Sequence, residues 1–466
     1  MTTEKITAPK LKPGSADRYA RLQALKKPAA AASRRAADSR ELLSTRDFDA
    51  LRGMSPDLPE GSDQLAQILG ASVQRNCFGE HLALRHWFAE SIGCEPPQSV
   101  NLAALRLLAP EATEDVADPA KWLFLDTETT GLAGGTGTYP FLIGVAWWDA
   151  GGLEVEQFFM REHSEEHSVL VALAERLAER PVLVTFNGKS FDWPLLETRY
   201  RMTRTIRPPA PRAHFDFLHP ARNLWRLRLG SVRLTELERH VLGWNRVDHL
   251  VSSLIPRIYF DFLRGGPPGP LVPIFHHNQM DLRGLAGLAS RTLSLLDAPD
   301  THGRDALELF GVSRIFERRG ERMRARTLYQ QSIERELPRE TERAAQRSLA
   351  RLAKREGDFK VACELWEKML GNSPEGLEAY EQLAIYYERR AGEPERAADM
   401  VRDALTELRR AQRIGILSET KHRKQVNRFE QRLVRLNRKP RRALLNPQDA
   451  ITPSSGQNEK PAFREK

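Results

Sequence analysis

The stretch KWLFLDTETTG, residues 121–131, decides the fold. Its first half is a short apolar run of the kind that a buried strand needs. Asp126 and Glu128 stand at positions i and i+2, so an extended chain places both carboxylates on one face of a sheet. Two neighbouring acids repel each other unless a proton or a cation compensates, so the pair suits a hard divalent metal ion. The alternative is that the two acids cap the following loop, because TTG (129–131) is typical of a turn.

The residues that follow predict an α/β domain. Two further strands are expected at 139–149 and 153–160, and the Gly151-Gly152 turn between them indicates a hairpin. Residues 165–180 carry apolar side chains at positions i, i+4 and i+8, which is typical of an amphipathic helix, and the strand 182–186 follows. The order strand, strand, strand, helix, strand is therefore readable from the residues alone.

Two more carboxylates lie where a metal site needs them. Asp192 begins a helix six residues after the last of these strands, and Asp281 lies within a long helix expected at 273–296. The region between them, 214–262, is expected to be helical with loops. Four carboxylates from separate segments are what a two-metal phosphoryl-transfer site needs, with cations about 3.5–4 Å apart. Asp126 is the best candidate to bridge both ions.

Composition excludes several classes of protein. The chain has 466 residues and a formal net charge of +9, with 41% hydrophobic residues, which is enough for a core and for two or three domains. No apolar run reaches the roughly 18 residues that a membrane span needs. Three cysteines are too few for a disulfide framework, which favours a reducing compartment. We therefore expect a cytoplasmic protein without membrane contact.

Changes of composition divide the chain into five expected segments. The excess of Lys and Arg lies entirely at the two ends of the chain. Such ends can attract a phosphate backbone, although a solvated tail is an equally good interpretation. The segments are a mobile basic leader (1–65), a lead-in segment that packs on the core (66–118), the α/β domain (119–298), a helical-repeat region (303–412) and a basic tail (413–466).

A repeat is visible after residue 300. Gly320, Gly357 and Gly392 are 37 and 35 residues apart, and an alanine follows each glycine five positions later. Small residues allow close helix packing, and the period is near the 34 residues of tetratricopeptide-like helix hairpins. A plain helical bundle with chance spacing is the alternative. Repeat arrays of this kind present a concave surface and usually bind protein, so we expect a protein partner there.

Three sequence motifs together carry a resemblance to a known family. DTETTG (126–131), NGKSFD (187–192) and HHNQMD (276–281) resemble, in the required order, the three exonuclease motifs of the DEDD branch of the ribonuclease H-like superfamily. The intervening GLAGGTGTYPFLIGVA (131–146) is more specifically similar to the YprB-type ribonuclease H-like proteins. The resemblance covers roughly residues 119–297.

The resemblance implies a fold, a cofactor and an activity. The expected fold is a mixed five-stranded sheet with flanking helices, the expected cofactor is two Mg²⁺ or Mn²⁺ ions, and the reaction is hydrolysis of a nucleic-acid phosphodiester. The resemblance also implies four metal ligands, which are Asp126, Glu128, Asp192 and Asp281.

The family's fifth residue is a histidine or tyrosine that orients or deprotonates the attacking water. His276 stands five residues before Asp281, and His277 stands four before it. If the helix already includes residue 277, the i, i+4 relation places His277 beside Asp281 and turns His276 away. If the helix begins later, His276 can fold back from a loop. We favour His277, while an ordinary surface histidine is the alternative for either residue.

Several residues are candidates for contacts with nucleic acid. In the Asn187-Gly188 loop, Asn187 and Lys189 could approach a phosphate, although turn formation is the simpler interpretation. The glycine-rich loop 134–137 lacks the lysine of a phosphate-binding loop, so it is expected to form a rim of the groove. The complete candidate set for substrate binding is Thr129, Asn187, Lys189, Arg222 and Arg226.

Two functions are therefore expected. The first is a metal-dependent nuclease, expected to act as a 3′→5′ exonuclease on single-stranded DNA or RNA by a two-metal mechanism. The alternative is a catalytically weak nucleic-acid-binding adaptor whose helical repeats bind protein partners. The residues alone do not separate DNA from RNA, or exonucleolytic from endonucleolytic cleavage.

Overall fold

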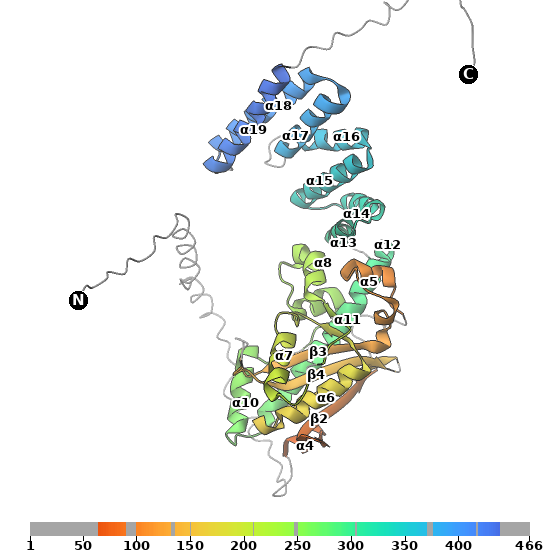
Figure 1. Cartoon of the computed structure of the whole chain (residues 1–466), viewed down its shortest axis with the longest axis vertical. Coiled ribbons are helices and arrows are strands. Elements are labelled where there is room, and N and C mark those ends of the chain that lie inside the picture. Colours follow the sequence, from red (N-terminus) through yellow and green to blue (C-terminus); the bar gives the residue numbers. More distant parts are fainter. Residues whose placement is uncertain are drawn as a thin grey trace, which may run out of the picture.

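The protein consists of an α/β domain and an arm of helices that extends away from it (Figure 1). The computed structural model describes residues 64–438, apart from 90–98, 132–135, 150, 208, 247–249, 303–304, 371–375 and 416–417. Nearly all of the expected basic leader (1–65), and the end of the basic tail from residue 439, lie outside the described residues. None of the described helices is long and apolar enough to cross a membrane.

One mixed sheet organises the α/β domain. Within the described residues it has seven strands in the order β1-β2-β5-β4-β3-β6-β7. β3, β6 and β7 run parallel to one another, and the remaining pairs are antiparallel. The bounds of the strands are β1 Ser72–Asn76, β2 Gly79–Phe88, β3 Trp122–Thr129, β4 Pro140–Asp149, β5 Gly152–Phe159, β6 Val182–Thr185 and β7 Ala213–Asp216.

The mixed sheet was predicted correctly, but its expected size of five strands was wrong. The four strands expected by residue range correspond to β3, β4, β5 and β6, β7 supplies a fifth, and the hairpin β1–β2 of the lead-in segment adds two more by pairing with β5. β7 begins before, and overlaps, the region that was expected to be helical. With four residues, β7 is too short to display the alternation by which a strand is recognised in a sequence.

Helices cover both faces of the sheet because side chains alternate along each strand. The odd-numbered residues Leu123 and Leu125 of β3 pack with α6 (Glu166–Glu179) and α7 (Asp192–Thr203). The even-numbered Trp122 and Phe124 pack with the opposite layer. That layer contains α5 (Leu102–Leu108), α8 (Leu218–Leu229) and α11 (Val272–Asp297). The remaining α- and π-helices described in the domain are α4 (Gln64–Leu69), α9 (Leu234–Leu237), η4 (Glu238–Leu242), α10 (Ile255–Leu263) and α12 (Pro299–His302).

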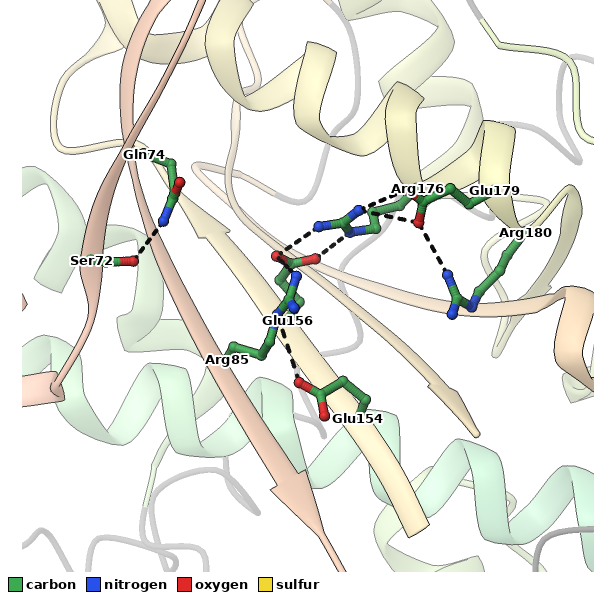
Figure 2. Close-up of polar contacts among 8 residues, drawn as sticks. All are labelled: Ser72, Gln74, Arg85, Glu154, Glu156, Arg176, Glu179 and Arg180. Atoms are coloured by element: carbon green, nitrogen blue, oxygen red, sulfur yellow. Dashed lines mark hydrogen bonds and ion pairs between the residues drawn. The ribbon is translucent and has the colours of Figure 1, made fainter. Parts of the chain in front are cut away.

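The additional hairpin is fixed to the sheet by a buried carboxylate. Glu156 of β5 lies directly opposite Arg85 of β2, and Arg85 Nη2 donates to Glu156 Oε1 at 2.8 Å. Arg176 of α6 donates to the same carboxylate from above the sheet (Figure 2). The hairpin, the central sheet and α6 therefore share one ion-pair network.

The C-terminal region is entirely helical within the described residues. Three successive pairs of helices are followed by a last helix that carries much of the basic tail. Their bounds are α13 Ala306–Arg319, α14 Arg322–Glu334, α15 Arg339–Glu356, α16 Phe359–Met369, α17 Gly376–Tyr386, η7 Tyr387–Ala391, α18 Pro394–Arg413 and α19 Glu419–Asn437. Helix α19 packs on the preceding helices because Phe429 and Leu436 bury their side chains in the shared core.

The spacing of the glycines corresponds to the helix pairs. Gly320, Gly357 and Gly392 each follow the first member of a pair and have φ values of 83°, 83° and 71°, a left-handed conformation that favours glycine. The alanine five positions later is fully buried in each pair. The all-helical prediction is confirmed, and the identification of these pairs as tetratricopeptide-like repeats stays a prediction.

Replacing Glu156 should detach the hairpin from the network. Burial opposes the charged form of Glu156, but hydrogen bonds from Arg176 and Arg85 outweigh it and lower the pKa of this carboxyl. We expect Glu156→Gln to reduce the free energy of unfolding at neutral pH by about 1–3 kcal/mol, measured by urea denaturation. Because the pKa is lowered on folding, this contribution is lost as the pH falls through the folded pKa, so the two proteins should converge in acid.

A matched control is Glu154→Gln, since Glu154 lies 3.7 Å from Arg85 Nε and, among the described residues, forms an ion pair with no second arginine. Equal stability losses for the two substitutions would contradict the role assigned to Glu156.

Candidate active site

The site is built around β3. Asp126 and Glu128 occupy even-numbered positions of this strand, on the face where Trp122 and Phe124 pack against α11. The pairing with β4 shifts between Glu128 and Thr129, which ends the regular strand just after the second acid. The predicted placement of both carboxylates on one face of the sheet therefore agrees with the observed strand.

Asn278 of α11 holds Asp126 in place. Its Nδ2 donates to Asp126 Oδ2 at 2.8 Å, and its Oδ1 accepts from Gln157 Nε2 at 2.7 Å. Asp126, Gly144 and Gln157 form one row across β3, β4 and β5, so Asn278 lies above Gly144 and between the two polar side chains. A Cβ atom at residue 144 would lie 2.0 Å from Asn278 Oδ1. The hydrogen bond between Asn278 and Asp126 therefore requires glycine at residue 144.

Helix α11 also brings His277 and Asp281 to the acids of β3. The helix begins at Val272, so His277 and Asp281 are one turn apart, and His277 Nε2 lies 3.6 Å from Asp281 Oδ2. The same nitrogen lies 3.9 Å from Glu128 Oε1. These three side chains keep only 12–18% of their surface exposed. His276 lies about 100° around the helix from His277 and is exposed, so the geometry favours His277 of the two candidates.

Asp192 reaches the site from the first turn of α7. Thr127 Oγ1 donates to Asp192 Oδ1 at 2.5 Å, which ties the second motif to the middle of the first. The preceding loop is fixed by Asp216 at the end of β7, whose two carboxylate oxygens accept from the backbone N–H groups of Asn187 and Lys189 at 2.8 and 3.0 Å. Three separate segments, β3, α7 and α11, therefore meet here.

Burial and neighbouring charges act on the acids of the site. Burial raises the pKa of Asp126 well above its usual value, and the charges of Asp281, Asp192 and Glu128 raise it further, while the hydrogen bond from Asn278 opposes the shift. Burial likewise raises the pKa of Asp192 to about 6, against the hydrogen bond from Thr127. Concentrated negative charge of this kind is stabilised by a cation.

The donor set fits a hard divalent cation in kind, because carboxylate oxygens are the preferred ligands of Mg²⁺ and Mn²⁺. Among the described residues, no three acidic, histidine or cysteine side chains are already arranged as a metal-holding cluster. One positive charge does lie within the site, since Arg246 Nη1 is 2.6 Å from Asp281 Oδ1 and Arg246 Nε is 3.1 Å from Glu238 Oε2. The Arg246 side chain is 6% exposed, so its guanidinium is buried and forms an ion pair with Asp281, the acid of the third motif.

Of the five residues expected to bind substrate, some lie near the acids and others lie elsewhere on the α/β domain. Thr129 is next to the acids and donates from Oγ1 to the carbonyl of Gly131 at 2.9 Å. Asn187 has a φ of 71°, and its loop is a turn fixed by Asp216, as the alternative interpretation expected. Lys189 lines a separate cavity of about 440 Å³ beside β7. Arg222 and Arg226 are exposed on α8, which packs on α13. Gly134 and Gly135 of the glycine-rich loop lie outside the described residues.

Several residues that support the acids of the site were not predicted from the sequence. Asn278 lies inside the quoted motif HHNQMD, but its amide can be assigned to Asp126 only after the helix and sheet are assembled. Gly144 and Gln157 looked like ordinary strand residues, and Asp216 lay at the edge of a region expected to be helical. A glycine within an apolar strand was the one available signal, since it marks a close approach of another group.

Adding a methyl group at Gly144 should displace Asn278 from Asp126. We expect Gly144→Ala to lower the free energy of unfolding by about 1–3 kcal/mol through overpacking, as measured by urea denaturation. Gly137→Ala is the control, because no described atom lies within 4 Å of a Cβ atom at that position, in the connection that precedes β4. Equal stabilities of the two variants would show that Asn278 does not depend on the space above Gly144.

Comparisons with known proteins place this geometry in a family. Residues 123–293 match the family model described as RNase_H superfamily. The chain is 31% identical over 323 residues to the uncharacterized protein YprB of Bacillus subtilis (strain 168), and the match covers 68% of this chain and 74% of that protein.

A solved structure of the family B DNA polymerase from the hyperthermophilic archaeon Pyrobaculum calidifontis matches 42% of this chain and 29% of its own, with 15% sequence identity and a TM-score of 0.29. The family assignment rests on the two sequence matches, and the family model spans the segments that supply all four acids. The chain therefore belongs to the YprB family within the ribonuclease H superfamily.

Proposed function

We propose that this chain is a metal-dependent nuclease that hydrolyses phosphodiester bonds of single-stranded DNA or RNA as a 3′→5′ exonuclease. Membership of the ribonuclease H superfamily supports a nuclease-like function. The observation that carries the proposal is that β3, α7 and α11 bring acids together around Asp126, whose pKa is raised by burial and by their charges. A buried concentration of carboxylates is unfavourable by itself and suits the binding of cations.

Asp126, Glu128, Asp192 and Asp281 are the proposed ligands, and nucleases of this superfamily commonly use divalent metals. Two Mg²⁺ or Mn²⁺ ions would activate the attacking water and stabilise the leaving oxygen. Asn278 and Thr127 orient the carboxylates of Asp126 and Asp192 through their hydrogen bonds. Such orienting contacts typically change metal affinity or activity by about 10–100-fold.

His277 is the proposed general base. Its Nε2 atom lies between the carboxylates of Glu128 and Asp281, at 3.9 and 3.6 Å, where it can accept a proton from a water molecule bound among the acids. Negative charge on both sides stabilises the imidazolium that forms. Helix α11 sets this position, because it carries the base and the third-motif acid on one face, one turn apart.

One observation favours the second candidate function, a catalytically weak nucleic-acid-binding adaptor. The ion pair between Arg246 and Asp281 compensates part of the negative charge of the site without a metal ion. In the nuclease, Arg246 must share Asp281 with a cation or release it. In the adaptor, the pair is permanent, and nucleic acid binds without turnover.

Removal of the central carboxylate should abolish cleavage. We expect Asp126→Asn to reduce Mn²⁺-dependent degradation of 5′-labelled single-stranded DNA and RNA by more than about 100-fold. The wild-type protein should produce a ladder of progressively shorter labelled products, as expected for removal of nucleotides from the 3′ end. Asp399→Asn is a control because Asp399 is exposed on α18 and pairs only locally with Arg402.

Cleavage that survives Asp126→Asn would mean that another enzyme in the preparation is responsible. Metal-independent binding without turnover on either substrate would favour the adaptor.

The two histidines of the third motif should differ in their contribution. We expect His277→Gln to lower kcat by about 100-fold or more while Mn²⁺ binding, measured by calorimetry, persists, because a general base is lost and the carboxylates remain. His276→Gln should behave like the wild-type protein, since that side chain is exposed. A larger loss of kcat in His276→Gln than in His277→Gln would reverse the assignment.

A further inference from the structure

A second cavity lies where the α/β domain meets the helical arm. Its volume is about 830 Å³, and residues of α8, α13, α14, α15 and α17 line it. Helices α13, α15 and α17 are the first members of the three helix pairs, whereas α16 and α18 contribute no residue to its lining. The first helix of each pair therefore lines this cavity, and Leu227 of α8 lines it from the α/β domain. Figure 1 shows α8 at the end of the α/β domain nearest the helical arm.

Arginine dominates the lining of this cavity. Arg347, Arg351 and Arg355 follow one another at intervals of four residues along α15, so they share one face of that helix with a rise of about 6 Å between successive residues. Arg314 and Arg318 of α13 repeat the interval on the neighbouring wall. The acidic residues of the lining are fewer, namely Glu317, Glu340 and Glu378.

The contacts of these five arginines leave their charge available. Arg318 donates to Asn223, Arg351 donates to Ser348, and Arg314 lies over the ring of Phe310. Among the described residues, no ion pair joins any of the five to a carboxylate. The nearby Glu317 instead accepts from the Tyr329 hydroxyl at 2.7 Å.

An arginine elsewhere on the same helix pairs provides a contrast. Arg326 of α14 pairs with Glu356 at 2.8 Å and with Asp358 at 3.4 Å. Acidic partners are thus present in this region, but they neutralise an arginine that does not line the cavity. The arginines of the cavity remain suited to an external anion, and guanidinium groups match phosphate oxygens in both charge and shape.

The cavity is held in a fixed position relative to the α/β domain. Helices α8 and α13 cross at Gly311, where a Cβ atom would lie 2.6 Å from the carbonyl oxygen of Asn223. The buried carboxylate of Glu308 on α13 accepts from Trp225 Nε1 at 2.9 Å and from Arg228 Nη1 at 2.8 Å, both on α8. A strand bound along the arginines would therefore lie at a fixed orientation to the domain that carries the acids.

We propose that this arginine-lined cavity binds the phosphate backbone of single-stranded nucleic acid and holds the strand whose end is cleaved at the carboxylates. A protein partner was expected for the concave surface of the helical repeats, whereas the excess of arginine over acid in the cavity lining favours a polyanion. The role of holding a substrate rests on the proposed nuclease function, but the binding itself does not.

Binding is measured with the full chain carrying Asp126→Asn, so that a bound strand stays intact. Fluorescein-labelled 20-nucleotide DNA and RNA strands serve as probes in anisotropy titrations at several salt concentrations. Replacing Arg347, Arg351 and Arg355 by glutamine should weaken binding at least tenfold. It should also reduce the slope of log affinity against log salt by about 2, since each phosphate contact on a single strand contributes about 0.7.

The matched control replaces Arg402, Arg409 and Arg413 by glutamine. These arginines are exposed on α18, outside the cavity. Replacing them removes the same amount of positive charge as the α15 variant. We expect wild-type affinity and salt slope for the control. The single variant Arg351→Gln, with a reduction of about 0.7 in the slope, provides the test if the triple variant does not fold.

Equal losses of affinity in the α15 and α18 variants would overturn the proposal, because binding would then depend only on total charge. Unchanged nucleic-acid binding by the α15 variant, together with arginine-dependent binding of a polyglutamate peptide, would also overturn it and assign the cavity to an acidic protein segment. Arginine-dependent binding in a chain that cleaves nothing would refute the nuclease function and leave the binding site in place.

Discussion

The contact between Asn278 and Asp126 is the constraint on which the site depends. It requires α11 to lie directly on the sheet, which in turn requires a glycine at residue 144, because any larger side chain would occupy the position of the Asn278 amide. Gln157 completes the row by donating to the same amide from β5. Once α11 is held at this distance, His277 and Asp281 reach the acids of β3 without further adjustment.

The remaining acid is positioned by a second set of contacts on the other side of β3. Asp216 ends β7 and binds the backbone of the Asn187 loop, so that Asp192 enters α7 within reach of Thr127. The consequence is a concentration of negative charge that raises the pKa of Asp126. Arg246 and its partner Glu238 show that the protein places a buried positive charge at the edge of the site.

Joining the helical arm to the sheet adds a property that neither part has alone. The contact of α13 with α8 closes a cavity whose walls come from both regions. Arg326, outside the cavity, forms an ion pair with Glu356, whereas the arginines that line the cavity form no ion pair with a described carboxylate. This difference arises only when the helices are assembled. The two sites of the molecule, one acidic and one basic, are thus linked through α8, which follows β7 directly.

The sequence by itself determined four strands of the sheet and two of its main helices, because apolar periodicity is local and survives in β3, β4, β5, β6, α6 and α11. It also indicated four acids in order and, through the i, i+4 relation, the preference for His277. Only the tertiary structure decided that the hairpin 72–88 extends the sheet and that Asn278, Gly144 and Gln157 support Asp126. Pairing across the sheet and contacts between distant segments depend on register and helix placement, which no local pattern encodes.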